Sequence, residues 1–212
     1  MNQPIHQVKY LKETASQTAG PYVHIGLAPH QAGFDIFQNN FDNNLVGATT
    51  RGAQIIIEGR VFDGSGSLVR DALIEAWQAN ADGRYNHPGD RQKTGSVDPN
   101  FRGWGRACTD FETGVYRFYT VKPGPVAGRE GKVQAPHISL WIVARGINMG
   151  LNTRLYFADE EKANDADPIL RGIELKKRRD TLIAKPSQKD GKTVYTFDIV
   201  LQGENETVFF DV

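Results

Sequence analysis

From residue 53 onward the chain is a close series of short alternating or apolar segments, separated by glycine, proline and aspartate turn signals. Strands are predicted at residues 55–61, 68–78, 116–119, 137–144, 153–157, 192–202 and 207–212. Successive side chains of a strand point to opposite faces, so a period of two indicates a half-buried strand. Short strands at such close intervals predict a mainly β chain folded as a β-sandwich or related barrel.

Two segments depart from this pattern. Asp167-Pro168 predicts the start of one short helix, because aspartate caps free amides and proline is preformed for a first turn. Residues 1–50 are irregular, rich in proline and glycine, and poor in periodic apolar positions. We therefore expect an N-terminal arm over residues 1–50 and a sandwich domain over residues 51–212. The arm must find its burial against that domain or against another chain.

The charge balance argues against several classes of partner. Lys plus Arg and Asp plus Glu number 25 each, which gives no electrostatic reason to expect nucleic acid or an anionic membrane. The basic run over residues 176–179 is therefore interpreted as a solvated face, with nucleic-acid binding as the alternative. No stretch has the length and hydrophobicity to span a bilayer. The single Cys108 suits a reducing cytosol, as a small core residue or, alternatively, a reactive thiol.

Four stretches, in this order along the chain, together resemble the intradiol ring-cleavage dioxygenases. They are residues 57–61 running through 73–85, residues 98–106, the Thr120-Val121-Lys122-Pro123-Gly124-Pro125 segment, and Ala135-Pro136-His137-Ile138. The resemblance implies an intradiol dioxygenase-like β-sandwich core whose loops hold a mononuclear ferric ion at one edge. Phenolates are hard anionic donors, which explains why such a family uses two tyrosines with two histidines for Fe(III).

The family's ligands can be placed on this sequence one at a time. The first tyrosine falls on Tyr85 and the first histidine on His137, and both are present. The second tyrosine falls on Val126 and the second histidine on Ser139, so half of the ligand set is missing. The family's substrate-side arginine falls on Gln134. Two donors cannot hold Fe(III) against water, so Tyr85 and His137 are interpreted as a relic metal site, with no metal in this chain.

One branch of the family, built from related α and β chains, shows this pattern. The likeness extends to residues 16–27, 144–148 and 203–212. It implies that this chain is the iron-free α chain of a cytoplasmic hetero-oligomer, with Fe(III) held by the β chain. The complex would cleave protocatechuate with O2 to 3-carboxy-cis,cis-muconate in the β-ketoadipate pathway. The alternatives are a self-sufficient iron dioxygenase using Tyr85, His137, His87 and water, or a non-enzymatic β-sandwich binding module.

Two further groups are candidate substrate-binding residues. Thr18, Gly20, Pro21 and Tyr22 lie in the arm, which the resemblance implies reaches the partner's iron-bearing pocket; the alternative is a tight turn with a packed tyrosine. Arg145 follows the apolar residues 140–144, where an unpaired guanidinium would be costly. It is expected to meet either a carboxylate of the fold or of the subunit contact, or the carboxylate of a substrate-like ligand.

Overall fold

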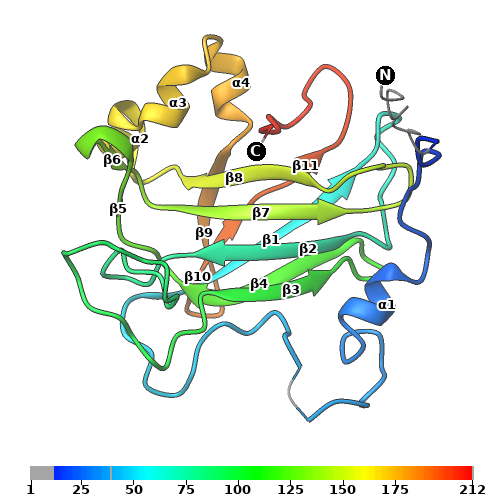
Figure 1. The fold of residues 1–212 in the computed structure, drawn as a ribbon, viewed down its shortest axis with the longest axis horizontal. Coiled ribbons are helices and arrows are strands. Elements are labelled where there is room, and N and C mark those ends of the chain that lie inside the picture. Colours follow the sequence, from blue (N-terminus) through cyan, green and yellow to red (C-terminus); the bar gives the residue numbers. More distant parts are fainter. Residues whose placement is uncertain (1–11, 39, 212) are drawn as a thin grey trace, which may run out of the picture.

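The computed structural model describes residues 12–38 and 40–211 (Figure 1). The strands are β1 (Gln54–Phe62), β2 (Leu73–Gln78), β3 (Trp104–Cys108), β4 (Val115–Val121), β5 (Val126–Ala127), β6 (Val133–Gln134), β7 (His137–Val143), β8 (Leu151–Phe157), β9 (Ile183–Lys189), β10 (Lys192–Thr196) and β11 (Ile199–Val200). The helices are α1 (Val23–Leu27), the 3-10 helix η1 (Arg129–Gly131), α2 (Glu161–Ala166), α3 (Pro168–Gly172) and α4 (Lys176–Asp180).

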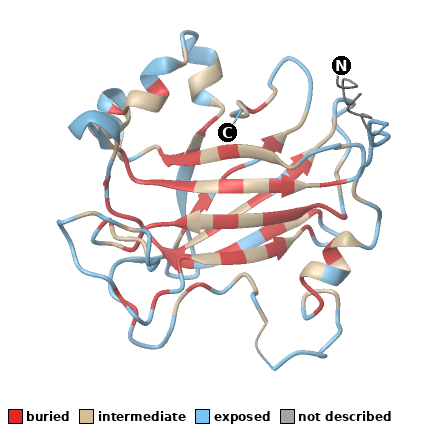
Figure 2. Cartoon of the chain, in the orientation of Figure 1, coloured by how far each residue is buried: buried red, intermediate tan, exposed pale blue. Residues whose placement is uncertain are grey.

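The strands form two facing layers, which confirms the predicted β-sandwich. One layer has the order β3-β2-β7-β8, and the other is built from β9, β10, β1 and β4, with β11 also paired to β1. The layers are joined where β8 and β9 run parallel over two residue pairs, Tyr156 with Ile183 and Phe157 with Ala184. Buried and partly exposed residues alternate along β2 and β7 in Figure 2, because one face of each strand packs against the opposite layer.

The core lies between the two layers. It is formed by inward side chains including Ile55, Ile57, Ile74, Phe118, Leu140, Ile142, Leu155 and Phe157. The opposite face of β2, β3, β7 and β8 points away from the core; we call it the outer face. The register places two rows of side chains across it. The first row is Trp104, Trp77, Ser139 and Arg154, and the second is Arg106, Glu75, Trp141 and Asn152.

The helical content was predicted wrongly in part. Asp167 caps α3 as expected, with its side chain accepting hydrogen bonds from the backbone of Ile169 and Leu170. The described residues nevertheless contain four short α-helices rather than one. Helix α3 ends at once because Ile173 is extended, and α4 begins only after the extended Leu175. The basic run forms α4, where Lys176 pairs with Asp180 and two other members pair with Glu204 and Glu206.

Strand prediction failed at two places near the C-terminus. β9 was missed, although Asp190 and Gly191, both with positive φ, form a tight turn that joins it to β10. Residues 207–211 were expected to be a strand, but they contribute only an isolated bridge between Asn152 and Phe210. Residue 212 of that predicted strand lies outside the described residues. The segment still runs along the free edge of β8, since Phe210 donates its backbone N–H to the carbonyl of Asn152.

The N-terminal arm covers the outer edge of β3. The Gln31 side chain donates to the carbonyl of Arg106 and accepts from the backbone N–H of Cys108. Further along, the backbone N–H of Arg106 donates to the carbonyl of Asp42. The arm therefore takes the place of a neighbouring strand and protects an edge that could otherwise pair with another chain. The boundary between residues 50 and 51 stays a prediction, and residues 1–11 and 39 of the arm lie outside the described residues.

Candidate functional site

The positions of the family's ligands converge on the outer face of the β3-β2-β7-β8 layer. Ser139 on β7 lies directly between Trp77 on β2 and Arg154 on β8 in the register of the sheet. The Arg154 Nη1 donates a hydrogen bond to Gln134 Oε1 at 2.6 Å. Gln134 is in turn paired with Val126 across the β5–β6 ribbon. The structure therefore brings the substituted positions Val126, Gln134 and Ser139 together around one arginine.

Tyr85 reaches the same place from the long loop between β2 and β3. Its ring stacks on Trp77, with centroids 5.6 Å apart and an angle of 7° between the planes. The Asp90 carboxylate fixes its backbone by accepting from the Tyr85 N–H and from Arg84 Nε, each at 2.9 Å. Burial raises the pKa of the Tyr85 phenol, whereas the Arg154 charge opposes that rise. Tyr85 is therefore a neutral phenol in this environment at ordinary pH.

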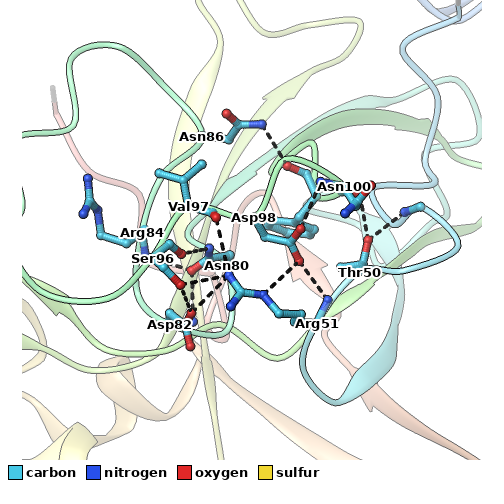
Figure 3. Close-up of polar contacts among 12 residues, drawn as sticks. Thr50, Arg51, Asn80, Asp82, Arg84, Asn86, Ser96, Val97, Asp98 and Asn100 are labelled. Atoms are coloured by element: carbon cyan, nitrogen blue, oxygen red, sulfur yellow. Dashed lines mark hydrogen bonds and ion pairs between the residues drawn. The ribbon is translucent and has the colours of Figure 1, made fainter.

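The loop that carries Tyr85 is held by an extensive polar network (Figure 3). Asn80 accepts from the backbone N–H groups of Asp82 and Arg84 and donates to the carbonyl of Ser96 at 2.7 Å. The buried Asp98 accepts from the backbone N–H of Arg51 at 2.8 Å, which lowers the pKa of its carboxyl group. The loop is thus ordered by its own polar side chains, as far as the described residues show.

A close approach of two motifs aligns the Tyr85 loop with β5. Gly83 has a φ of +76°, and a Cβ there would lie 2.1 Å from the carbonyl oxygen of Pro125. The backbone N–H of Gly124 donates to the carbonyl of Asn80 at 2.9 Å. Only glycine tolerates both the dihedral angle and the contact. This packing explains why the Gly83-Arg84-Tyr85 stretch and the Lys-Pro-Gly-Pro turn occur together in the resemblance.

His137, at the start of β7, is buried and fixed by backbone contacts. Its Nδ1 donates to the carbonyl of Ala135 at 2.7 Å, and the backbone N–H of Ala135 donates to the buried Asp167. Tyr156, opposite His137 in the register, donates its hydroxyl to Asp167 as well. Burial lowers the pKa of His137 to about 4, and the Arg154 charge acts in the same direction. His137 is therefore neutral at neutral pH.

This donor set does not fit a ferric ion. Val126 supplies no donor atom, and Ser139 offers a neutral hydroxyl in place of an imidazole. Within residues 12–38 and 40–211, no group of three or more His, Cys, Asp or Glu side chains could hold a metal ion. The Arg154 cation acts on the pKa of both kept residues, Tyr85 and His137. A positive charge there opposes metal binding.

His87 does not complete the ligand set. It is exposed, its ring edge contacts Trp77 at a centroid distance of 5.8 Å, and its Nδ1 accepts from the backbone N–H of Gly89. Tyr85 contacts the same indole by stacking. The hypothesis of a self-sufficient iron site therefore lacks its third protein ligand in this arrangement.

Arg145 lies at the opposite end of β7, beyond Ala144. It forms an ion pair with the buried Asp71, whereas the Arg145 side chain as a whole is 62% exposed. The predicted need for an anion is therefore met within the chain. The backbone N–H of the next residue, Gly146, donates to Thr18 Oγ1 at 2.8 Å, so the arm is fastened to the same turn. The substrate-binding role of Arg145 stays a prediction.

The other arm residues are open to the surroundings. Tyr22 is 76% exposed and directly precedes α1, and Gly20 has open space where a Cβ would lie. In the chain without a partner, Tyr22 is not the packed tyrosine of the alternative interpretation, because little of its surface is covered. Thr18, Gly20, Pro21 and Tyr22 are not brought near Tyr85 and His137 by any described contact. Their substrate-binding role stays a prediction.

Arg154 was missed by sequence reasoning. The alternation of β8 places it on the outer face, but its position opposite Ser139 depends on the pairing of β7 with β8. No local pattern distinguishes such an arginine from a solvated one. Gln134 and Ser139 replace a family arginine and a family histidine, but these substitutions do not indicate which residue of β8 lies beside them.

The described residues contain no helix that is both long and apolar enough to cross a membrane. A family model described as dioxygenase matches residues 25–203. The chain is 48% identical to the protocatechuate 3,4-dioxygenase alpha chain of Pseudomonas putida over 96% of this chain and 98% of that one. It is 40% identical to the protocatechuate 3,4-dioxygenase beta chain of Burkholderia cepacia, over 74% of this chain and 67% of that one. Among solved structures, 3-chlorocatechol 1,2-dioxygenase of Rhodococcus opacus is similar in fold, with a TM-score of 0.56 and 20% identity over 74% of this chain and 63% of that one.

Proposed function

The chain belongs to the intradiol dioxygenase family, and we propose that it is the iron-free α subunit of a two-chain protocatechuate 3,4-dioxygenase. The complex takes protocatechuate and O2 to 3-carboxy-cis,cis-muconate by splitting the bond between the two hydroxyl-bearing carbons. Both oxygen atoms enter the product. The likeness to alpha chains over nearly the full length of both proteins supports the subunit type.

The observation that carries this proposal is the incomplete ligand set on the outer face. Tyr85 and His137 are present, but Val126 and Ser139 stand where the family has its other tyrosine and histidine. Arg154 lies opposite Ser139 and supplies a positive charge where a ferric ion would need anionic donors. The iron of the complex is therefore assigned to the partner β chain, and no step of the reaction uses this chain's own relic site.

The arm supplies the second line of support. Phe34, Ile36, Phe37 and Phe41 are each at least half exposed, and they follow one another within eight residues. Such a concentration of uncovered apolar side chains is typical of a surface that another chain buries. We propose that residues 1–50 contact the β chain, and that Thr18, Gly20, Pro21 and Tyr22 line its substrate pocket. Arg145 is proposed to bind substrate carboxylate from the same side.

We place the complex in the cytoplasm. Burial raises the pKa of the Cys108 thiol to about 12, so the single cysteine is a poor nucleophile. A chain with one inert cysteine needs no oxidising compartment.

The test is to express this chain alone and together with a β-type chain from the same source. We expect the chain alone to hold no iron and to cleave no protocatechuate. The co-expressed complex should contain one iron per αβ unit and take up O2 when protocatechuate is added. Iron content by elemental analysis and O2 uptake with an electrode measure the two outcomes separately.

A wine-red, iron-loaded and active preparation of this chain alone would overturn the proposal, because tyrosinate–Fe(III) sites are coloured. Failure of the two chains to associate would overturn it as well. A Tyr22→Ala variant tests the arm: it should change the KM of the complex while the iron content stays at the wild-type level.

A further inference from the structure

The outer face carries a cavity of about 680 Å³ that the proposed function leaves unused. Its lining includes three tryptophans, Trp77, Trp104 and Trp141, together with Arg154. Pockets of 300–1,000 Å³ with aromatic walls and a few polar groups are typical of small-molecule sites. The cavity lies beside the relic metal site, but its chemistry is different, because its dominant groups are indole rings and a guanidinium.

Arg154 is the partly buried cation of the cavity lining. Among the described residues no carboxylate forms an ion pair with it. Its Nη1 donates to Gln134 Oε1, which leaves most of the guanidinium's five donors for another acceptor. The side chain is only partly exposed, so water satisfies it less fully than a surface arginine. A partly buried cation of this kind is stabilised by an anion, because burial without one costs free energy.

The acidic residues of the lining do not meet that need. Glu75 is paired with Arg106 at 2.6 Å, and Glu130 is paired with Lys132 at 3.3 Å. Asp211 also lines the cavity but is exposed and forms no described ion pair. The exposed Arg129 and Lys132 add positive charge at the rim. The anion-binding capacity of the cavity therefore centres on Arg154.

The register of the sheet sets the spacing between the residues that would contact a ligand. Trp77, Ser139 and Arg154 are directly adjacent on three neighbouring strands. Two strand spacings separate Trp77 from Arg154, which is roughly 10 Å between backbones. The small Ser139 lies between them and leaves space above it. An aromatic ring beside Trp77 with a carboxylate directed at Arg154 matches this arrangement of indole, gap and cation.

We propose that this cavity is a second, non-catalytic site that binds a small aromatic carboxylate, with Arg154 receiving the carboxylate and Trp77 contacting the ring. The site belongs to this chain and needs no metal. It goes beyond the subunit role of the proposed function.

Benzoate is the probe, because it has the ring and the carboxylate but lacks the adjacent hydroxyls that the dioxygenase cleaves. Isothermal titration of the αβ complex should give one more bound benzoate per αβ unit than titration of the Arg154→Gln complex. The affinity at that site should fall on the order of tenfold or more when the charge is lost. Phenol and cyclohexanecarboxylate, which lack the carboxylate and the aromatic ring, should each bind this site more weakly than benzoate.

Two further variants make the result specific. Arg171→Gln removes a charge from α3 at a residue outside the cavity lining, and it should leave benzoate binding unchanged. Ser139→Phe fills the gap and keeps Arg154, and it should abolish the site. Thermal unfolding checks that each complex is folded, and iron content and O2 uptake of the same samples report on the subunit role independently.

Equal benzoate stoichiometry and affinity in the wild-type and Arg154→Gln complexes would overturn the proposal. Equal binding is also expected if a carboxylate side chain of the partner forms an ion pair with Arg154 in the complex. An equal loss in Arg171→Gln would overturn it too, because the effect would then come from surface charge.

Discussion

The two ends of β7 each meet an arginine, and the two arginines are used in opposite ways. At one end, beyond Ala144, Arg145 pairs with the buried Asp71, and the adjoining Gly146 binds Thr18 of the arm. At the other end, Arg154 lies opposite Ser139 and contacts the neutral Gln134. The first end is closed by contacts within the chain, whereas the second keeps a cation beside a cavity. The end that lost its metal ligands is thus the one whose arginine has no carboxylate partner among the described residues.

The largest expected effect is on iron content, and it tests whether the Arg154 charge opposes metal binding. Val126→Tyr with Ser139→His restores the two missing donors, which makes four together with Tyr85 and His137. We expect this double variant to hold little iron, and the triple variant with Arg154→Gln to hold about one iron per chain, because a guanidinium repels a trivalent cation at short range. Elemental analysis and the visible absorption of tyrosinate–Fe(III) measure the difference.

The control is the same double variant with Arg171→Gln, which removes a charge away from the site. It should hold as little iron as the double variant. If the double variant alone takes up a full complement of iron, Arg154 is no barrier, and the contrast between the two ends of β7 is weaker than the structure indicates.

The second effect concerns the stability of the protein at acid pH, through His137 at the start of β7. The pKa of His137 is lowered to about 4 from an ordinary value of 6.5. Between these values the unfolded chain binds a proton that the folded chain does not, so stability is lost as the pH falls from about 6.5 to about 4. A shift of this size corresponds to about 3 kcal/mol at most.

Urea unfolding of wild type and His137→Gln between pH 7.5 and pH 4 measures this loss. The variant has no imidazole to protonate, so the stability difference between the two proteins should narrow or reverse toward pH 4. Parallel pH profiles would show that His137 is not kept neutral by its burial beside Arg154.

The third effect compares the two arginines directly. Arg145→Ala leaves the buried carboxylate of Asp71, whose Oδ1 has no described hydrogen bond, without its cation. We expect a loss of about 1–3 kcal/mol in the free energy of unfolding. Arg154→Ala removes no ion pair and one hydrogen bond, to Gln134, and should change it by about 1 kcal/mol or less. Urea unfolding at pH 7.5 gives both values, and equal losses would contradict the comparison.

Local patterns predicted the parts of the fold that depend on local physics. The apolar or alternating residues of β1, β4 and β7 predict strands, and Asp167-Pro168 predicts the cap of α3. β9 gave no such signal, because five of its seven side chains are exposed and Pro186 lies within it. The Asp190-Gly191 turn was the available clue, since this dipeptide favours a two-residue hairpin.

The site residues, like the strands, could be predicted only where a motif or a local pattern marks them. The mapping of Tyr85, Val126, His137 and Ser139 came from motif order, and the structure brings these positions to one face. The position of Arg154 could not be predicted, because it depends on which β8 residue lies opposite Ser139. A shift of one residue in that register would move Arg154 into the core. Likewise, the buried Asp71 that meets Arg145 is 74 residues away along the chain and carries no pattern that links the two.

The smallest expected effect tests how the arm is fastened to the Arg145 end of β7. Thr18→Ala removes the acceptor for the Gly146 N–H, an exposed contact that should contribute about 0.5–1 kcal/mol. Global stability should therefore barely change, but hydrogen exchange at the Gly146 amide should become faster. Thr18→Ser keeps the hydroxyl and should exchange at the wild-type rate. If Thr18→Ala leaves that exchange unchanged in the chain alone, the arm is not held at this turn before a partner binds, and only the Arg145–Asp71 pair would distinguish this end of β7 from the other.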